Sequence, residues 1–216
     1  IANLSKDIGA WFIHYSTDYV FDGLKKIPYV ETDSTNPINV YGSSKVAGEQ
    51  AILKTSCNHI IFRTTWVIGK NGSNFAKTMI KLMTSQKILH VINDQIGVPT
   101  SPSLITQVTL DAINSIKKDK AWPKGIYHVA PKGISNWYEI AQTVLKILEK
   151  NNIKLMLNSK MIKPIKSVEF KTVANRPLNS LLNTKKLESK LSFNLPYWKD
   201  DFVLVVNDLI KEFHKQ

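Results

Sequence analysis

The segment from residue 40 to residue 69 reads VYGSSKVAGEQAILKTSCNHIIFRTTWVIG, and it decides the fold class of the chain. Its first half, Val40 to Thr55, follows a turn-rich stretch and predicts a helix. Its second half, residues 59–68, is an apolar run closed by Gly69, which is typical of a strand buried on both faces of a parallel sheet. A helix that leads directly into such a strand predicts an α/β protein.

The same alternation extends outward in both directions. On the amino-terminal side, residues 1–8 predict the last turns of a helix that ends at Gly9, and residues 11–16 predict a strand. On the carboxyl side, the pattern predicts further helices and strands in turn: a helix over 74–86, a strand over 88–92, a helix over 103–116, a strand over 125–130 and a helix over 135–150. Strands that alternate with helices predict a Rossmann-like, doubly wound parallel sheet.

The carboxyl-terminal third has a different character. Residues 154–176 mix lysines with short apolar pieces around Pro164, and we expect a small irregular cap there. An amphipathic helix is predicted over about 199–214. We therefore expect residues 1–130 to form the carboxyl-terminal part of a Rossmann-like domain, interleaved with substrate-binding segments. Residues 131–216 are expected to form mainly a substrate lobe and the terminal helix.

Composition predicts a soluble protein of the cytoplasm without a membrane partner. The chain has 43% hydrophobic and 21% charged residues. No run approaches the roughly 20 apolar residues that a membrane span needs, and the first residues do not form a signal peptide. The single Cys57 cannot form an internal disulfide, which fits a reducing compartment.

The net charge of +12 raises the question of a nucleic-acid partner. Among the 29 basic residues, however, only Arg63 and Arg176 are arginines, and the lysines form no dense cluster. Readers of nucleic acid usually favour arginine for bidentate contacts, so we expect no specific nucleic-acid binding. In a chain this rich in lysine, an arginine is expected to be retained for its fork geometry, which suits a carboxylate or a phosphate.

Candidate chemistry gathers around Tyr41 and Lys45. They stand four residues apart at the start of the predicted helix, so they lie on one face. This spacing also arises by chance on exposed helices, but here the strand over 11–16 ends in hydroxyls at Ser16 and Thr17. In an open parallel sheet, ligands bind at the carboxyl ends of the strands. The sequence therefore predicts a compact proton-handling site.

A free phenol has a pKa of about 10, and a neighbouring ammonium favours the phenolate. With Lys45 nearby, Tyr41 can donate a proton to an oxygen that gains negative charge as a hydride reaches the adjacent carbon. Thr17 can hydrogen-bond the same oxygen and hold it in place.

Five motifs carry a resemblance to a known family: residues 15–23, 39–45, 62–67, 74–79 and 91–95. In order and spacing they resemble the extended short-chain dehydrogenases, and among these the family of dTDP-4-dehydrorhamnose reductases. The resemblance runs from Ile1 to the region of Arg176. It implies reduction of the 4-keto group of dTDP-4-dehydrorhamnose to dTDP-L-rhamnose, with NADPH or NADH as cofactor, for lipopolysaccharide or other surface polysaccharide.

The resemblance also implies roles for individual residues. Tyr41 is the proton donor, Lys45 is its partner and the ligand of the nicotinamide ribose, and Thr17 tunes Tyr41. Three residues contact the sugar of the dTDP-sugar substrate: Thr17, Asp18 and Trp66. Tyr15 lies against the cofactor.

Other residues of the motifs have less definite roles. Asn74, Gln95 and Arg176 could hold the phosphates or the base of the substrate. Trp66 has an alternative as a core aromatic residue at a strand end, and Arg63, in the middle of a strand, is expected to be structural.

Two related functions stay open at this point. The regulatory subunit of methionine adenosyltransferase resembles the same family and retains much of the Tyr and Lys pattern, and it would consume no NADPH. A nucleotide-sugar epimerase or dehydratase is the other alternative, although such enzymes usually place an acid pair or another base near the sugar.

The sequence departs from the family pattern at two points, which concern dinucleotide binding and a metal between subunits. The glycine-rich loop that holds the dinucleotide pyrophosphate would precede residue 1. We therefore expect the sequence to be part of a longer protein whose first strands are missing here, and the chain alone to bind dinucleotide poorly and to be inactive. Some relatives also carry a glutamate near Ser103 that holds magnesium between subunits. Because Ser103 has no carboxylate, we expect a homodimer, if formed, without a bridging metal, and no zinc site either.

Overall fold

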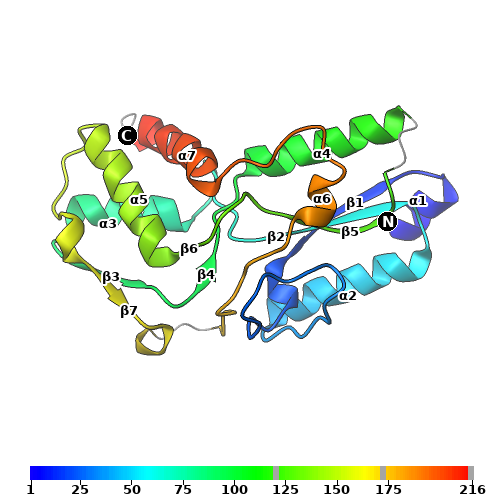
Figure 1. Cartoon of the computed structure of the whole chain (residues 1–216), viewed down its shortest axis with the longest axis horizontal. Helices are drawn as coiled ribbons and strands as arrows, with labels where there is room; N and C mark the ends of the chain where they lie inside the picture. The colour runs from blue at the N-terminus through cyan, green and yellow to red at the C-terminus, as the bar shows by residue number, and fades with distance from the viewer. Residues whose placement is uncertain (119–121, 171–173, 214–216) are drawn as a thin grey trace. The chain divides into compact units, whose positions relative to one another are not determined.

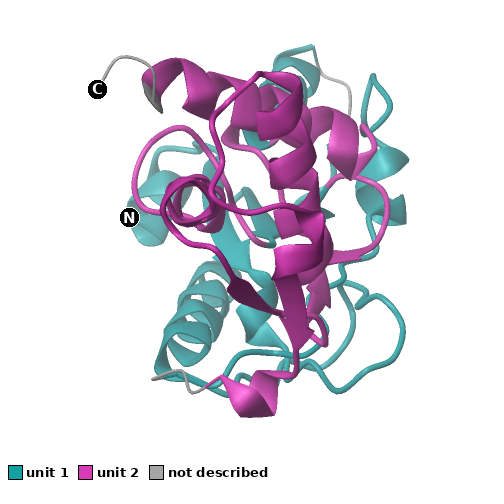
Figure 2. Ribbon diagram, turned by 90° about the vertical axis from the view of Figure 1, so that its left-hand side faces the viewer, with its two compact units in different colours: residues 1–65, 105–130, 173–195 teal, residues 66–104, 131–172, 196–216 magenta. Residues whose placement is uncertain are grey.

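The computed structural model describes residues 1–118, 122–170 and 174–213. They group into two compact units that interleave along the chain (Figure 2). Unit 1 comprises residues 1–65, 105–130 and 173–195, and unit 2 comprises residues 66–104, 131–172 and 196–216. The predicted division after residue 130 coincides with one passage of the chain between the units. Residues 66–104, however, belong to unit 2, and the cofactor and substrate roles of the two parts stay predictions.

The centre of unit 1 is a parallel sheet of three strands in the order β1-β2-β5. The strands are β1 (Phe12–Thr17), β2 (His59–Thr64) and β5 (Gly125–Val129), drawn side by side in Figure 1. All residues of β2 are buried, as the continuous apolar run predicts for a central strand. The predicted α/β class with parallel strands is therefore confirmed.

Helices cover both faces of this sheet (Figure 1). On one face lies α2 (Val40–Thr55), which contributes Ile52 to a cluster with Ile61 of β2. On the other lies α4 (Pro102–Lys117), where Thr109 hydrogen-bonds the Tyr15 hydroxyl. Coverage of both faces is the doubly wound arrangement that the alternation of strands and helices predicts.

Local signals account for the ends of the helices in unit 1. The first helix, α1 (Ala2–Asp7), stops where predicted because Gly9 adopts a φ of +67°, which favours glycine. Helix α2 begins after Asn39, whose side-chain oxygen accepts the Gly42 N–H at 2.8 Å. A short 3₁₀ turn, η1 (Asp18–Val20), follows β1, and α6 (Lys185–Glu188) completes the unit.

Unit 2 is built from three helices, α3 (Phe75–Ser85), α5 (Trp137–Lys150) and α7 (Trp198–Phe213), and two small sheets. In one sheet β3 (Leu89–Ile92) runs parallel to β7 (Ile162–Ile165), and in the other β4 (Ile96–Gly97) pairs antiparallel with β6 (Ser135–Asn136). Two 3₁₀ turns, η2 (Ser159–Met161) and η3 (Ser167–Glu169), flank β7. Figure 1 shows β3 and β7 side by side.

Two strands differ from the prediction. The strand predicted over 88–92 is present as β3, but it pairs with β7 and does not continue the main sheet. The segment predicted as an irregular cap, 154–176, contains β7, a short strand that the pattern concealed because it includes Lys163 and Pro164. Proline lacks an N–H, so it is tolerated only where a ladder bond is not required.

Several boundaries differ by one or more residues, and three of them are informative. Strand β2 ends at Thr64 rather than at residue 68, and Trp66 adopts a φ of +39°, which is incompatible with a continuing strand. Helix α5 begins at Trp137, because Asn136 rather than Ser135 caps it. Helix α7 begins one residue before the predicted position, and its predicted end at residue 214 lies outside the described residues.

Candidate active site

Hydrogen bonds among neighbouring residues fix the carboxyl end of β1. The Thr17 hydroxyl donates to Asp18 Oδ1 at 2.9 Å and accepts the Tyr19 N–H at 3.2 Å. Thr17 and Asp18 are both buried. The hydroxyl and the carboxyl that the sequence predicts at this edge are therefore fixed next to each other.

Burial changes the acidity of Asp18. Loss of hydration raises its pKa to about 6, although hydroxyls of Ser180, Thr17 and Thr65 and a backbone N–H partly offset the effect. Near neutral pH both protonation states of this carboxyl are accessible. Asp18 can therefore accept a hydrogen bond from a ligand hydroxyl when ionised and donate one when protonated.

Helix α2 presents Tyr41 and Lys45 beside this strand end. The Lys45 ammonium donates to the main-chain oxygen of Tyr15 at 2.6 Å, which ties α2 to β1. The Tyr41 side chain is 54% exposed, so its phenol is open to a ligand while its lysine neighbour is held.

Gly42 explains how closely α2 approaches η1. A Cβ at this position would lie only 2.2 Å from the Tyr19 carbonyl oxygen and 2.9 Å from Pro37. Only glycine permits this approach, and it brings the Tyr41 ring edge-on to the Tyr19 ring at a centroid distance of 5.8 Å.

Tyr19, which follows Asp18, has no role predicted from the sequence. Burial raises its pKa, Asp18 adds to the increase, and Arg176 opposes it. Arg176 is exposed, and the main-chain oxygen of the preceding residue, Asn175, accepts a hydrogen bond from Asn39 at 2.9 Å. The structure thus brings Arg176 to the same end of unit 1 as Tyr41. The position of Tyr19 directly after the Thr17-Asp18 pair was the signal that could have identified it.

The main chain and the side chain of Tyr15 make different contacts. Its carbonyl binds Lys45, while its hydroxyl shares a hydrogen bond of 2.8 Å with Thr109 of α4. Its ring stacks on Phe62 and remains 43% exposed. An exposed aromatic face at the carboxyl edge of a parallel sheet suits the planar ring of a cofactor.

The remaining predicted residues belong to unit 2. Trp66 stacks on Trp137 with centroids 3.8 Å apart, and Trp137 donates its indole N–H to Gln95 at 3.0 Å. A Cβ at Gly97 would lie 2.7 Å from the Trp66 ring, so Gly97 allows the ring to lie flat against the chain. Asn74 is the N-cap of α3, accepting the Lys77 N–H at 3.1 Å.

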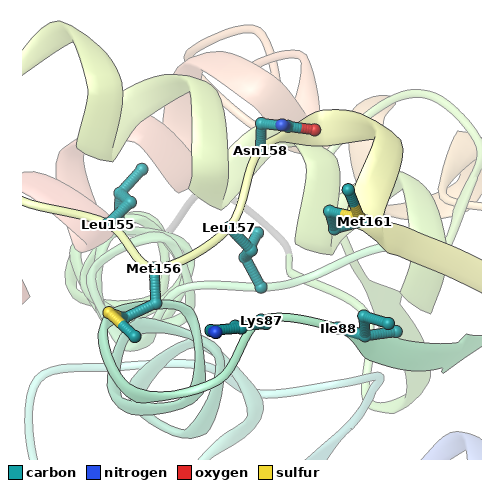
Figure 3. A pocket seen from close by; sticks show the side chains of 7 residues that line it. All are labelled: Lys87, Ile88, Leu155, Met156, Leu157, Asn158 and Met161. Atoms are coloured by element: carbon teal, nitrogen blue, oxygen red, sulfur yellow. The ribbon is translucent and has the colours of Figure 1, made fainter.

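Two cavities are lined by residues of unit 2. One, of about 540 Å³, has a mostly apolar lining of Leu155, Met156, Leu157, Met161 and Ile88, with Lys87 and Asn158 (Figure 3). The other, of about 340 Å³, includes Asn74, Ser103 and Asp201 in its lining. Within the described part of the chain, no three His, Cys, Asp or Glu side chains are grouped so that they could hold a metal ion.

Unit 1 therefore combines a phenol and an ammonium one helical turn apart with a hydroxyl and a carboxyl at the end of a parallel strand. On a doubly wound fold this is the combination that the resemblance to the short-chain dehydrogenases predicts at the carboxyl end of a strand.

Comparison with known proteins places the chain more narrowly. The chain belongs to the RmlD substrate binding domain family, whose profile matches residues 1–211. It is 42% identical over 209 residues to a curated dTDP-4-dehydrorhamnose reductase of Escherichia coli K12, an alignment that covers 97% of this chain and 69% of the relative. A second reductase of the same name, from Burkholderia thailandensis, is 35% identical over 98% of this chain and 72% of its own length.

Solved structures agree with this assignment. A dTDP-4-dehydrorhamnose reductase from Clostridium acetobutylicum superimposes with a TM-score of 0.84 at 32% identity, covering 97% of this chain and 69% of that one. The reductase of Bacillus anthracis, solved in complex with NADP, gives a TM-score of 0.77 at 32% identity over 100% of this chain and 69% of its own. A UDP-galactose 4-epimerase, at 19% identity and a TM-score of 0.76, shares the fold.

Proposed function

We propose that this polypeptide catalyses the NAD(P)H-dependent reduction of dTDP-4-dehydrorhamnose to dTDP-L-rhamnose. Identities of 42% and 35% to curated reductases over nearly the whole chain support this reaction. The observation that carries the proposal is the geometry of α2, where Lys45 is fixed on the Tyr15 carbonyl and Tyr41, one turn earlier, is open at the end of β1.

The residues of unit 1 fit a nicotinamide cofactor. The half-buried Lys45 ammonium is a donor for ribose hydroxyls, and Tyr15 offers an exposed aromatic face. We infer that these two residues hold NADPH or NADH, which when bound supplies the hydride.

In this mechanism Tyr41 donates its phenolic proton to the keto oxygen as negative charge develops there. The positive charge of Lys45, one helical turn away, is placed to offset the negative charge that develops as the proton is transferred. Thr17 and Asp18 hold hydroxyls of the sugar, and Trp66 stays a candidate sugar contact that rests on the family resemblance alone. Arg176, Asn74 and Gln95 are candidates for binding the phosphates and the base.

We further propose that the protein acts in the cytoplasm on a dTDP-sugar, with no specific nucleic-acid or membrane partner. In the part of the chain that the structure describes, no helix is long and apolar enough to cross a membrane.

A homodimer without bridging metal stays a prediction, and the mass measured by light scattering with and without chelator tests it.

The test of the proposed function is NADPH oxidation by the natural full-length polypeptide in the presence of dTDP-4-dehydrorhamnose, with the product identified by mass spectrometry and NMR. Formation of dTDP-L-rhamnose in step with NADPH consumption is expected. Absence of NADPH consumption would favour the regulatory alternative. Conversion of a nucleotide-sugar without net NADPH consumption would favour an epimerase or a dehydratase.

A further inference from the structure

A buried ion pair joins α2 to the central strand of unit 1. Arg63 of β2 donates from Nε to Glu49 Oε1 at 2.9 Å and from Nη2 to Glu49 Oε2 at 2.6 Å. Both side chains are only 3% exposed. The Arg63 guanidinium also lies over the Phe21 ring, 5.1 Å from its centroid. The pair is therefore bidentate, desolvated and held in one orientation.

Glu49 belongs to the same helical stripe as the acid–base residues. Tyr41, Lys45 and Glu49 follow one another at intervals of four residues on α2, so they lie on one side of the helix. Lys45 ties this stripe to β1 through the Tyr15 carbonyl, and Glu49 ties it to β2 through Arg63. Two ties to adjacent strands fix the rotation of α2 about its axis, and hence the direction in which Tyr41 points.

Stability alone does not explain this ion pair. Removing two charges from water costs several kcal/mol for each ion, and apolar side chains of similar size commonly stabilise a core equally well. Arg63 Nη1 is moreover buried without a hydrogen-bond partner among the described residues, as is the Ser16 hydroxyl on the neighbouring strand, paired in register with Arg63. Each such atom carries a further desolvation cost. Unlike an apolar contact, the bidentate pair is favourable only in one relative orientation of the two side chains.

We propose that Arg63 and Glu49 are positioning residues, which orient α2 so that Tyr41 and Lys45 meet the substrate in the reactive geometry. The inference rests on the proposed reductase function. It also explains why an arginine occupies this position in a chain with only two arginines, since a lysine cannot make two parallel hydrogen bonds to one carboxylate.

The decisive variant removes both charges together. In the full-length protein, Arg63→Met combined with Glu49→Leu leaves no unpaired buried charge, so we expect a folded protein with a melting temperature near or above that of the wild type. We expect kcat to fall on the order of 10- to 100-fold, because a small misplacement of reacting groups has an effect of this size. The KM for the sugar should change by less than about threefold, because substrate contacts are unchanged. Arg63→Lys keeps the charge but only one hydrogen bond. Its kcat should lie between that of the wild type and that of the double variant.

Ile52→Ala is the matched control. Ile52 lies on α2, is buried and packs on Ile61, but it belongs to neither tie. It should lower the melting temperature while keeping kcat within about twofold of the wild type. A double variant with wild-type kcat would overturn the inference, and so would an equal loss of kcat in Ile52→Ala. A wild-type enzyme that does not reduce the keto-sugar would instead overturn the proposed function on which the inference rests.

Discussion

Helices α2 and α5 are held in place by different kinds of contact. The residues that α5 buries are apolar: Ile140, Ala141, Val144, Leu145, Ile147 and Leu148. Helix α2 is two residues longer, yet it buries only Gly42, Glu49 and Ile52. Its attachment depends on a lysine bound to a main-chain oxygen and on a bidentate ion pair.

The difference follows from what each helix does. Apolar burial is favourable in many orientations, because it depends on area rather than on direction. Hydrogen bonds and bidentate pairs are favourable only within narrow ranges of distance and angle. A helix that fills a core needs the first kind of contact, and a helix that aims a phenol at a substrate needs the second.

The largest effect is expected from Tyr41→Phe. Loss of the phenolic proton should reduce kcat by about 10²- to 10⁴-fold, the usual contribution of a general acid. Stability should be nearly unchanged, because the side chain is 54% exposed and the ring contact with Tyr19 is retained. Steady-state kinetics and thermal unfolding measure both quantities. A variant with more than half of the wild-type kcat would remove Tyr41 from the mechanism.

The converse is expected of Leu145→Ala in α5. Leu145 is fully buried, so the substitution should lower the free energy of unfolding by about 2–5 kcal/mol. The kcat of the fraction that remains folded should equal that of the wild type. Urea unfolding and activity below the transition test this pair of results. A large loss of kcat in the folded protein would show that apolar helices also direct the chemistry.

Two buried ionisable groups should give unit 1 opposite responses to pH. Burial, followed by the charge of Arg63, lowers the pKa of His128 from 6.5 to about 3. The unfolded chain binds the extra proton below pH 6.5, so this group lowers stability as the pH falls from 6.5 toward 3, by at most about 1.4 kcal/mol per pH unit. In His128→Asn the loss of stability between pH 6.5 and pH 4 should be smaller than in the wild type.

Asp18 acts in the other direction. Burial raises its pKa from 3.8 to about 6, so the folded protein keeps the proton longer than the unfolded chain. This group therefore lowers stability as the pH rises from about 4 to 6, and the loss persists above that range. Asp18→Asn should remove this loss, gaining stability relative to the wild type as the pH rises. Parallel curves of unfolding free energy against pH for the two variants would contradict both assignments.

The smallest effects are expected at the two helix caps, which form a matched pair. Asn39 caps α2 and Asn136 caps α5, each accepting a backbone N–H at 2.8 Å. Either residue changed to Ala should lower the free energy of unfolding by about 0.5–2 kcal/mol. Only Asn39→Ala should also lower kcat, because that cap lies two residues before Tyr41. Equal kcat values in the two variants would show that the Asn39 cap does not help to position the Tyr41 phenol.

Much of unit 1 could be predicted because its signals are local. The alternation of apolar and polar residues identified α2, β1 and β2 within a few residues, and the four-residue spacing of Tyr41 and Lys45 placed them on one face of a helix. Family resemblance then supplied roles for Thr17, Asp18 and Trp66 that spacing alone does not supply, and those roles are still predictions.

Other features could not be found in this way. Strand β7 is only four residues long and contains a proline, so no periodic pattern marks it, and its partner β3 lies about 70 residues earlier in the chain. The pairing of Arg63 with Glu49 could not be predicted either. The position of Arg63 in the middle of an apolar run indicates that it is buried, but it does not indicate which residue it pairs with.

Local sequence is enough to predict the succession α1, β1, α2 and β2, the ends of α1 and α2, and the spacing of the phenol and the ammonium. Each of these depends on residues within one or two turns of one another, where backbone geometry leaves few choices. The tertiary structure alone decided that Lys45 binds the Tyr15 carbonyl, that Glu49 faces Arg63 and that β3 leaves the main sheet for β7. These contacts depend on strand order and register, because a hydrophobic pattern specifies which side chains are buried but not which polar groups meet inside.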